Sequence, residues 1–180
     1  MSTHKLPGYR ATLRTAKRLA EEAVRVVERA VPGKMPDVQI ILATGRDMAE
    51  LATAAQVETA GGDVDKWVQN RALRAARRTA DNVAGRSVPL ADGGVLIVIN
   101  IEQHPNEAAF ATTLVHELVH AMQHSRKGVR ERLVSGLRND LGVERLSRRQ
   151  NREHERCLEQ EEREAYGVEY LARRVVPSAA

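Results

Sequence analysis

Apolar and small residues recur at helical spacing over much of the chain. The clearest stretch covers residues 12–31 and stops at Pro32-Gly33, a pair that ends helices. Weaker, alanine-rich patterns cover residues 47–59 and 64–83, on either side of Gly61-Gly62. The first half of the chain is therefore predicted to contain three helices.

Three short runs rich in β-branched residues predict strands. Residues 37–43 (DVQIILA) are flanked by turn residues, as expected of a buried strand. Residues 87–90 and 95–101 lie on either side of the turn sequence ADGG at 91–94. Because Asp-Gly supports the positive φ angles of tight turns, these two runs predict a β-hairpin.

The period becomes helical again after residue 106. The pattern runs through Ser125 and ends near Gly128, a residue typical of the position just past a helix C-terminus. Residues 130–142 are expected to be irregular with a short helix, and residues 147–175 to form a long helix before a frayed tail at 176–180. Together these elements predict an α+β fold with a small mixed or antiparallel sheet of three to four strands.

Size and composition indicate a folded chain with one core. A chain of 180 residues, 42% hydrophobic and 29% charged, lies in the globular range. We expect one domain over residues 1–180, since this length does not accommodate two large ones. Aromatic residues are scarce, so the core is expected to consist of Ala, Val, Leu and Ile in packed helices.

Charge and cysteine content bear on compartment and partners. The first 30 residues carry charges throughout and do not resemble a signal peptide, and the longest apolar run, 95–99, is too short to span a bilayer. Cys157 is the single cysteine, which excludes an intrachain disulfide. We expect a cytoplasmic protein without a membrane partner. The net charge of +4 permits nucleic-acid contact without indicating it.

The segment HELVH at residues 116–120 carries the candidate chemistry. Residues four apart on a helix point the same way, so His116 and His120 can direct two ring nitrogens at one ion. Glu117 lies beside them, where it can hold a water molecule. Zinc lowers the pKa of a bound water toward about 7, and a carboxylate can take the proton as the oxygen attacks a carbonyl. The motif therefore predicts a Zn²⁺ site, with Glu117 as general base and later as proton donor to the leaving amine.

These residues resemble the gluzincin zinc metallopeptidases, and in particular their small single-domain relatives, the minigluzincins. The resemblance covers mainly residues 95–175. It implies a zincin-like fold, with an active-site helix that carries the motif and a C-terminal helix that completes the zinc site. It also implies hydrolysis of a peptide or protein substrate. The segment EREA at residues 162–165 is similar to the family's downstream pattern, which implies Glu162 as the third zinc ligand.

Other acids in the same segment compete for the third ligand position. Glu161 lies nearer than Glu162 to the centre of an apolar stripe on the helical wheel, and Glu164 stands directly before an alanine, as the ligand does in some gluzincins. The apolar stripe comprises Cys157, Leu158, Ala165, Val168 and Ala172. All three acids can also be part of a solvated face.

Several gluzincins carry an aspartate four residues after the ligand to orient a histidine, whereas this chain has Tyr166.

The remaining histidines and Cys157 are expected to be structural. His124 continues the ladder from His120, but three imidazoles on a straight helix do not converge on one tetrahedral ion, which favours packing at the helix end. Cys157 is expected to be a buried core residue. His104 is expected in a loop cap and His154 on the solvated surface, while His4 falls in the N-terminal tail.

Two further features concern specificity and partners. The absence of a histidine at Arg126 and of a glycine at Gln123 argues against a metzincin. The strand at 95–101 is expected to form the cleft edge that pairs with an extended substrate. A group of arginines on the helix predicted at 64–83 is more typical of a solvated face than of a phosphate-binding one. These arginines are Arg71, Arg74, Arg77 and Arg78.

The alternative function is a zinc-binding module without proteolysis, acting in protein interactions or at nucleic acid.

Overall fold

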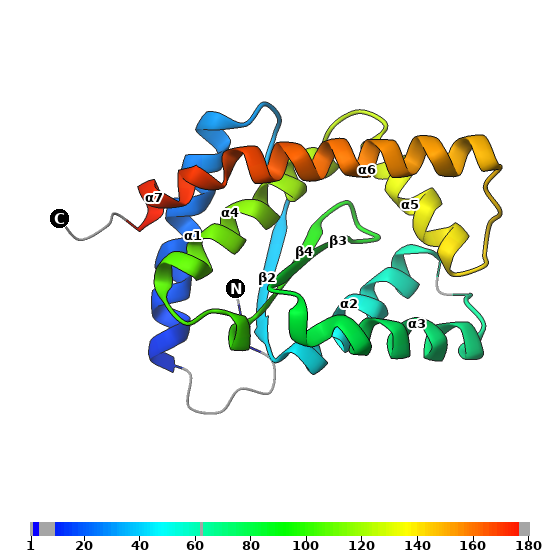
Figure 1. The fold of residues 1–180 in the computed structure, drawn as a ribbon, viewed down its shortest axis with the longest axis horizontal. Coiled ribbons are helices and arrows are strands. Elements are labelled where there is room, and N and C mark those ends of the chain that lie inside the picture. The colour runs from blue at the N-terminus through cyan, green and yellow to red at the C-terminus, as the bar shows by residue number, and fades with distance from the viewer. Residues whose placement is uncertain (1, 4–9, 62, 177–180) are drawn as a thin grey trace.

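The protein has an α+β fold built on one mixed sheet (Figure 1). The computed structural model describes residues 2–3, 10–61 and 63–176, and the statements below concern these residues. The sheet has the order β1-β2-β4-β3, with β1 at Ser2–Thr3, β2 at Val38–Ala43, β3 at Gly85–Pro89 and β4 at Val95–Asn100. β2 pairs in parallel with both β1 and β4, whereas β3 and β4 form an antiparallel hairpin. The α+β class, the central strand and the hairpin are thus confirmed.

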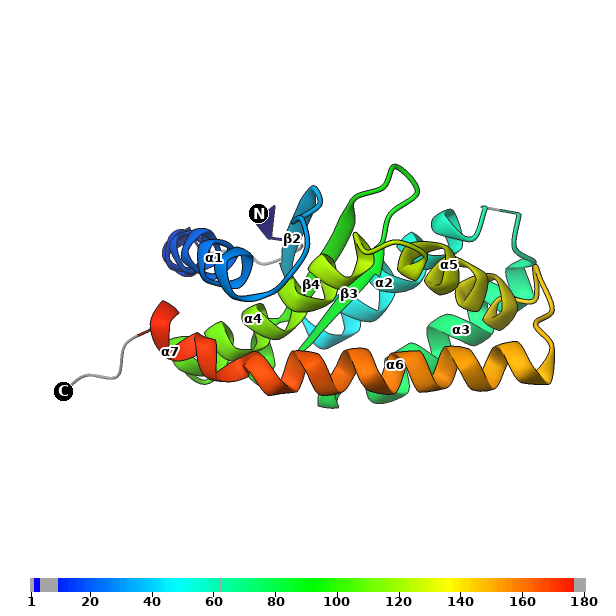
Figure 2. The same cartoon turned by 90° about the horizontal axis from the view of Figure 1, so that it is seen from above.

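Helices cover both faces of the sheet (Figures 1 and 2). One face packs against α1 (Arg10–Ala30) and α4 (Glu107–His124), with α6 (Arg148–Val168) and α7 (Ala172–Val175) completing that layer. The other face packs against α2 (Gly45–Thr59), and α3 (Lys66–Thr79) lies against α2. Short 3-10 turns follow α3 at Ala80–Asn82, β4 at Ile101–Gln103 and α6 at Glu169–Leu171. None of the helices in the described ranges combines the length and apolarity needed to cross a membrane.

β4 is the centre of the core. All six of its residues are buried, because its odd-numbered side chains from Val95 to Ile99 face α1 and α4 while Leu96 and Val98 face α2. This strand is hydrogen-bonded on both sides, to β2 and to β3. The expectation that it forms an open cleft edge is therefore wrong, and β3 is the edge strand.

Two helical boundaries differ from the sequence-based expectation. Residues expected to be mostly irregular form α5 (Val129–Asp140), a 12-residue helix that begins after Gly128, whose φ is +79°. α5 packs against α6 at Gly136, where an added Cβ would lie 2.5 Å from the His154 ring. The long C-terminal helix is interrupted after Val168 by the 3-10 turn. The predicted frayed tail lies outside the described residues from 177 onward, while Val176 packs partly against the core.

Candidate metal centre

The motif lies in the middle of α4, on the face turned toward α6. The helix begins at Asn106, whose side chain accepts a hydrogen bond from the Ala109 N–H, and it ends in the turn capped by Ser125. Much of its remaining surface is buried, which fixes its rotation about its axis. The buried residues that hold the helix in this orientation include Leu114, Val115, Leu118, Val119 and Met122.

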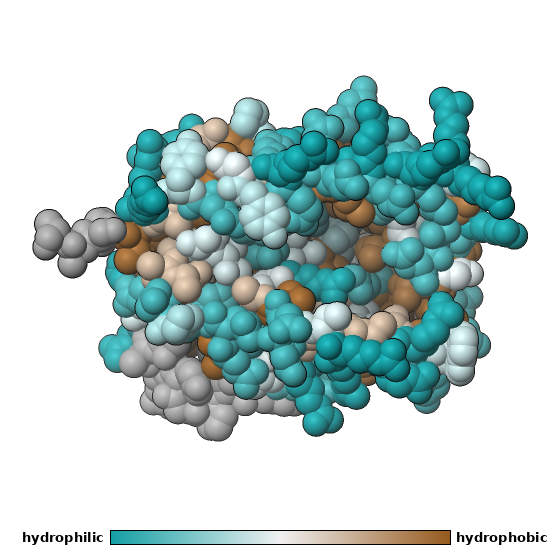
Figure 3. Space-filling view, viewed as in Figure 1, coloured by the Kyte–Doolittle hydropathy of each residue, from teal (hydrophilic) through white to brown (hydrophobic). Residues whose placement is uncertain are grey.

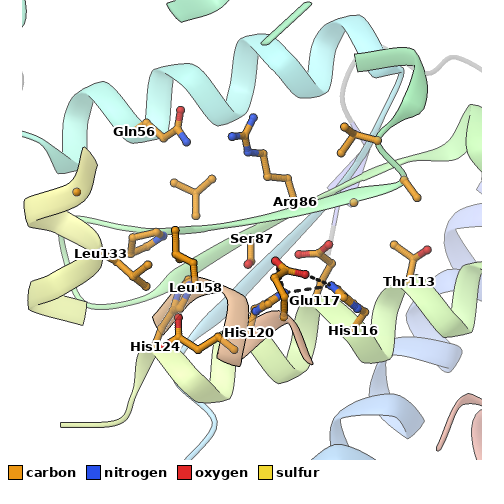
Figure 4. Close-up of a pocket in the computed structure, with 18 of the residues that line it drawn as sticks. Gln56, Arg86, Ser87, Thr113, His116, Glu117, His120, His124, Leu133 and Leu158 are labelled. Carbon is orange, nitrogen blue, oxygen red and sulfur yellow. Dashed lines mark hydrogen bonds and ion pairs between the residues drawn. The ribbon is translucent and has the colours of Figure 1, made fainter. Parts of the chain in front are cut away.

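The two histidines and one glutamate bring their ligand atoms to metal-binding distances. His116 Nε2 lies 3.1 Å from His120 Nε2, and Glu162 places Oε1 3.3 Å from His120 Nε2 and Oε2 3.5 Å from His116 Nε2. Ligands at about 2.0–2.1 Å from a tetrahedral zinc ion are about 3.3 Å apart. The spacing of these atoms therefore matches a zinc site, and the dashed lines of Figure 4 mark the cluster.

Each histidine is oriented through its other ring nitrogen. His116 Nδ1 lies 2.9 Å from Glu169 Oε1, and His120 Nδ1 lies 2.8 Å from Gln123 Oε1. The Gln123 amide is itself fixed, because its Nε2 donates to the Glu161 carbonyl at 2.9 Å and to Glu164 at 3.1 Å. Both Nδ1 atoms therefore face oxygen atoms that can accept a hydrogen bond, which favours the tautomer with the ring proton on Nδ1.

This arrangement leaves lone pairs facing one another. With the proton on Nδ1, each Nε2 presents a lone pair to the other and to the Glu162 carboxylate. Nitrogen lone pairs and carboxylate oxygens that converge in this way form a donor set that a cation between them would stabilise. Imidazole nitrogen and carboxylate oxygen are ligands that zinc accepts, and the hydrogen-bonded Nδ1 groups are the usual support of zinc-binding histidines. The residues present therefore fit Zn²⁺.

The competing glutamates have other partners. Glu161 pairs with Arg132, and Glu164 receives two hydrogen bonds of 2.6 Å from the Arg126 guanidinium. Burial of Glu161 and Glu164 is accordingly compensated by arginine. Of the three acids considered from the sequence, the structure brings Glu162 alone to the histidine pair.

Glu117 is buried beside the edge strand. It is 6% exposed, and burial raises its pKa to about 8, with the Glu162 charge acting in the same direction. Hydrogen bonds from Ser87 and the charge of Arg86 oppose this shift. A cation bound near the carboxyl would lower the pKa again by favouring the charged form. Glu117 is thus a buried carboxyl that can take up and release a proton.

Gly85 allows Glu117 to approach β3 closely. A Cβ built on Gly85 would lie 2.7 Å from Thr113 Cγ2 and 2.9 Å from both Cγ and Oε1 of Glu117. Gly85→Ala is therefore expected to destabilise the protein by about 1–3 kcal/mol, the range typical of overpacking. Urea unfolding measures this. The control is Gly167→Ala in α6, because a Cβ built on Gly167 would meet no neighbouring atom within 4 Å. This change should stabilise the helix by up to about 1 kcal/mol. Equal stabilities for the two variants would contradict the close approach.

The candidate metal centre lies in a cleft of about 670 Å³. The wall opposite α4 and α6 is β3, and α5 closes one end through Leu133 and Leu137. Figure 3 shows the same side as Figure 1: the surface is hollowed between the polar rims formed by α6 and α3, and apolar residues lie in the hollow. The side chains labelled in Figure 4 line this space from α2, α4, α5, α6 and the edge strand. The site is therefore open to an extended ligand along β3.

Sequence reasoning missed the residues that support the histidines. Glu169 lies two helical turns after Glu162, but it belongs to the 3-10 turn beyond the end of α6. Tyr166, at the position where relatives carry an orienting aspartate, instead places its ring 4.8 Å from the His116 ring, is 63% exposed, and donates no hydrogen bond within the described chain. Glu169, and not Tyr166, is thus the residue that contacts the His116 Nδ1. The signal available in the sequence was the acid at helical spacing on the same face.

Glu169→Ala is expected to weaken zinc binding by about 10- to 100-fold, the effect typical of losing the partner of a zinc-bound histidine. The reason is that the His116 Nδ1–H would lose its acceptor. Competition with a chromophoric chelator measures the affinity. Tyr166→Phe is the matched control and should leave it unchanged. The role of Glu169 would be disproved by equal affinities for native protein and Glu169→Ala.

The other histidines and the cysteine lie outside the cluster. His124 ends α4, and burial lowers its pKa to about 3, which keeps the ring neutral. His104 Nδ1 donates to the Asn100 carbonyl at 2.7 Å, and its Nε2 lies 2.9 Å from Thr113 Oγ1, as in a loop-capping residue. The expectation for His154 is wrong, because its ring packs on α5 at Gly136. Cys157 is only partly buried, since the N-terminal half of α6 extends beyond the core, so the expectation of a core cysteine is also wrong. His4 lies outside the described residues.

The arginine group lies on α3, a helix without buried residues. Arg77 pairs with Glu50 at 2.6 Å, and Arg71 lies 5.1 Å from the centre of the exposed Trp67 ring. Arg74 and Arg78 are exposed as well, which agrees with a solvated face.

The chain matches no protein family, no curated protein and no solved structure. Functional assignment therefore rests on the chemistry of the site.

Proposed function

We propose that the chain is a zinc metallopeptidase of the gluzincin type with a zincin-like fold. The observation that carries this proposal is the convergence of one ligand atom each from His116, His120 and Glu162, next to the buried carboxyl of Glu117. The order of elements also agrees with the zincin pattern, since an edge hairpin precedes the motif helix and a later helix supplies the glutamate.

The chain's own residues account for the steps of peptide hydrolysis. Bound zinc would polarise the scissile carbonyl and acidify the attacking water. Glu117 accepts the proton that this water loses as its oxygen bonds to the carbonyl carbon. It then delivers that proton to the nitrogen as the C–N bond breaks. Ser87 holds the Glu117 carboxyl in place through its hydrogen bonds.

The edge of the sheet supplies a place for the substrate backbone. β3 is paired on one side only, with β4, and its other edge borders the cleft. An extended peptide can add to this edge as a further strand, with main-chain hydrogen bonds that do not depend on its sequence. This geometry favours a peptide or protein over a small compact substrate.

The proposal is tested by reconstituting the metal-free protein with zinc and incubating it with a random peptide library. One zinc ion per chain and cleavage that a chelator abolishes and zinc restores are the expected results. Stoichiometric zinc without cleavage would instead support a zinc-binding module that acts through its partners, for which the exposed α3 surface around Trp67 and Arg71 is a contact candidate.

A further inference from the structure

Arg86 occupies a distinct position on the edge strand. Its neighbours Gly85 and Ser87 face α4 and contact Glu117. Because side chains alternate along a strand, Arg86 faces the opposite side of the sheet, toward α2. It lines the cleft, and Figure 4 shows its guanidinium pointing into the space between β3 and α2. Arg86 is therefore one residue from the catalytic carboxyl without belonging to the metal centre.

The Arg86 guanidinium has no carboxylate partner in the described part of the chain. Partial desolvation lowers its pKa, and the charge of Glu117 opposes this shift, but no hydrogen bond or ion pair joins Arg86 to another described residue. By contrast, Arg126 and Arg132, which lie outside the cleft lining, are each paired with a glutamate. Arg86 is also the one lysine or arginine among the described residues that line the cleft. Its five N–H donors are thus free for a ligand.

Gln56 adds a second free donor on the same side. It comes from α2, is half-buried and lines the cleft with Arg86. Figure 4 shows both side chains directed into the space above the β3 ribbon. The Gln56 amide forms no hydrogen bond with another described side chain. A planar guanidinium fork with a nearby amide is a donor set that suits a carboxylate, which Arg can bind through two parallel hydrogen bonds.

The pairing geometry relates this donor set to a substrate. A peptide added to the free edge of β3 would place the residue opposite Arg86 on the same face of the sheet. We propose that Arg86 and Gln56 form a subsite that binds a carboxylate of the peptide, so that bonds close to an acidic residue or to a free C-terminus are preferred. This inference rests on the proposed peptidase function for its setting, but the subsite can be tested without cleavage.

The test uses hexapeptides that carry Glu, Gln or Lys at each position in turn, with a free or amidated C-terminus. Cleavage by the zinc-loaded protein is followed by mass spectrometry, and binding to Glu117→Gln by fluorescence anisotropy. We expect Glu peptides to be preferred over Gln peptides by about tenfold, the order expected for one charge-assisted pair. Arg86→Met should remove this preference and Arg86→Glu should shift it toward Lys. Arg74→Met, which removes the same charge from the exposed face of α3, should leave it intact.

The outcomes separate the subsite from the peptidase. A preference that depends on Arg86 and persists in amidated peptides assigns the carboxylate to a side chain, whereas one lost on amidation assigns it to the C-terminus, and both support the subsite. Arg86-dependent binding without any cleavage would support the subsite and overturn the peptidase. Cleavage without preference for a carboxylate, or cleavage with an equal preference in Arg86→Met and Arg74→Met, would overturn the subsite and leave the peptidase standing.

Discussion

Glu117→Gln is expected to lower kcat/KM for peptide hydrolysis by about a thousandfold, within the range known for loss of a general acid–base residue. The amide keeps the size of the side chain and its contact with Ser87, but it cannot take a proton from water. Zinc content should stay at the native level, because Glu117 is not among the clustered ligand atoms. Steady-state kinetics on the best peptide of the library, with zinc measured on the same sample, checks both statements.

The control for this prediction is Glu107→Gln at the first turn of the same helix. Glu107 is exposed and pairs with Arg18 at 3.3 Å, so its loss should leave kinetics unchanged. An activity of Glu117→Gln within a few fold of the native value would show that the base is another group. Loss of zinc together with activity would show that Glu117 acts on the metal site instead of on the proton.

Glu162→Gln is expected to weaken zinc binding by more than about a hundredfold, which exceeds the effect typical of losing a supporting hydrogen bond. The change removes the negative charge that faces the two Nε2 atoms while keeping the length of the side chain. Peptidase activity at limiting zinc should fall in parallel. Zinc affinity from chelator competition provides the measurement.

Two neighbours on α6 serve as matched controls for Glu162. Glu161→Gln weakens the pair with Arg132, and Glu164→Gln weakens the pair with Arg126, so each should affect stability more than zinc affinity. Glu164 also accepts from Gln123, which orients His120, and its loss should therefore cost more zinc affinity than that of Glu161. Similar small losses for all three variants would exclude Glu162 as the third ligand.

Local features of the fold could be predicted because they follow from short-range geometry. The separation of His116 and His120 by four residues fixes their common direction as soon as the segment is helical. The turn before β4 follows from the conformational freedom of its glycine, since Gly93 has a φ of +100°. Both statements need no knowledge of the rest of the chain.

Features that depend on distant contacts were missed. The apolar composition of β4 suits a strand beside a cleft as well as a central one, and only the pairing of β4 with both β2 and β3 shows that β3 has the free edge. α5 has a weak apolar pattern, and its packing depends on the close fit of Gly136 to His154 from α6. Glu169 reaches His116 because the 3-10 turn after α6 packs on α4, a tertiary contact that a helical wheel does not represent.

The choice among the three glutamates shows the same limit for the site. On the helical wheel Glu161 lies closer to the apolar stripe than Glu162 does, and it is indeed the less exposed of the two, with 15% of its side chain accessible against 50%. Its burial is explained by Arg132 from α5, a partner that the wheel does not contain. The amphipathic pattern therefore predicts which acid is buried, whereas the position of α4 determines which acid meets the histidines.

The central claim is that one zinc ion is held by His116, His120 and Glu162. Diffraction from crystals of the zinc-loaded protein, recorded on both sides of the zinc absorption edge, tests it most directly. We predict one anomalous peak within about 2.2 Å of both Nε2 atoms and of a Glu162 oxygen. An anomalous peak at another group of side chains, or none in a sample that contains stoichiometric zinc, would contradict the account.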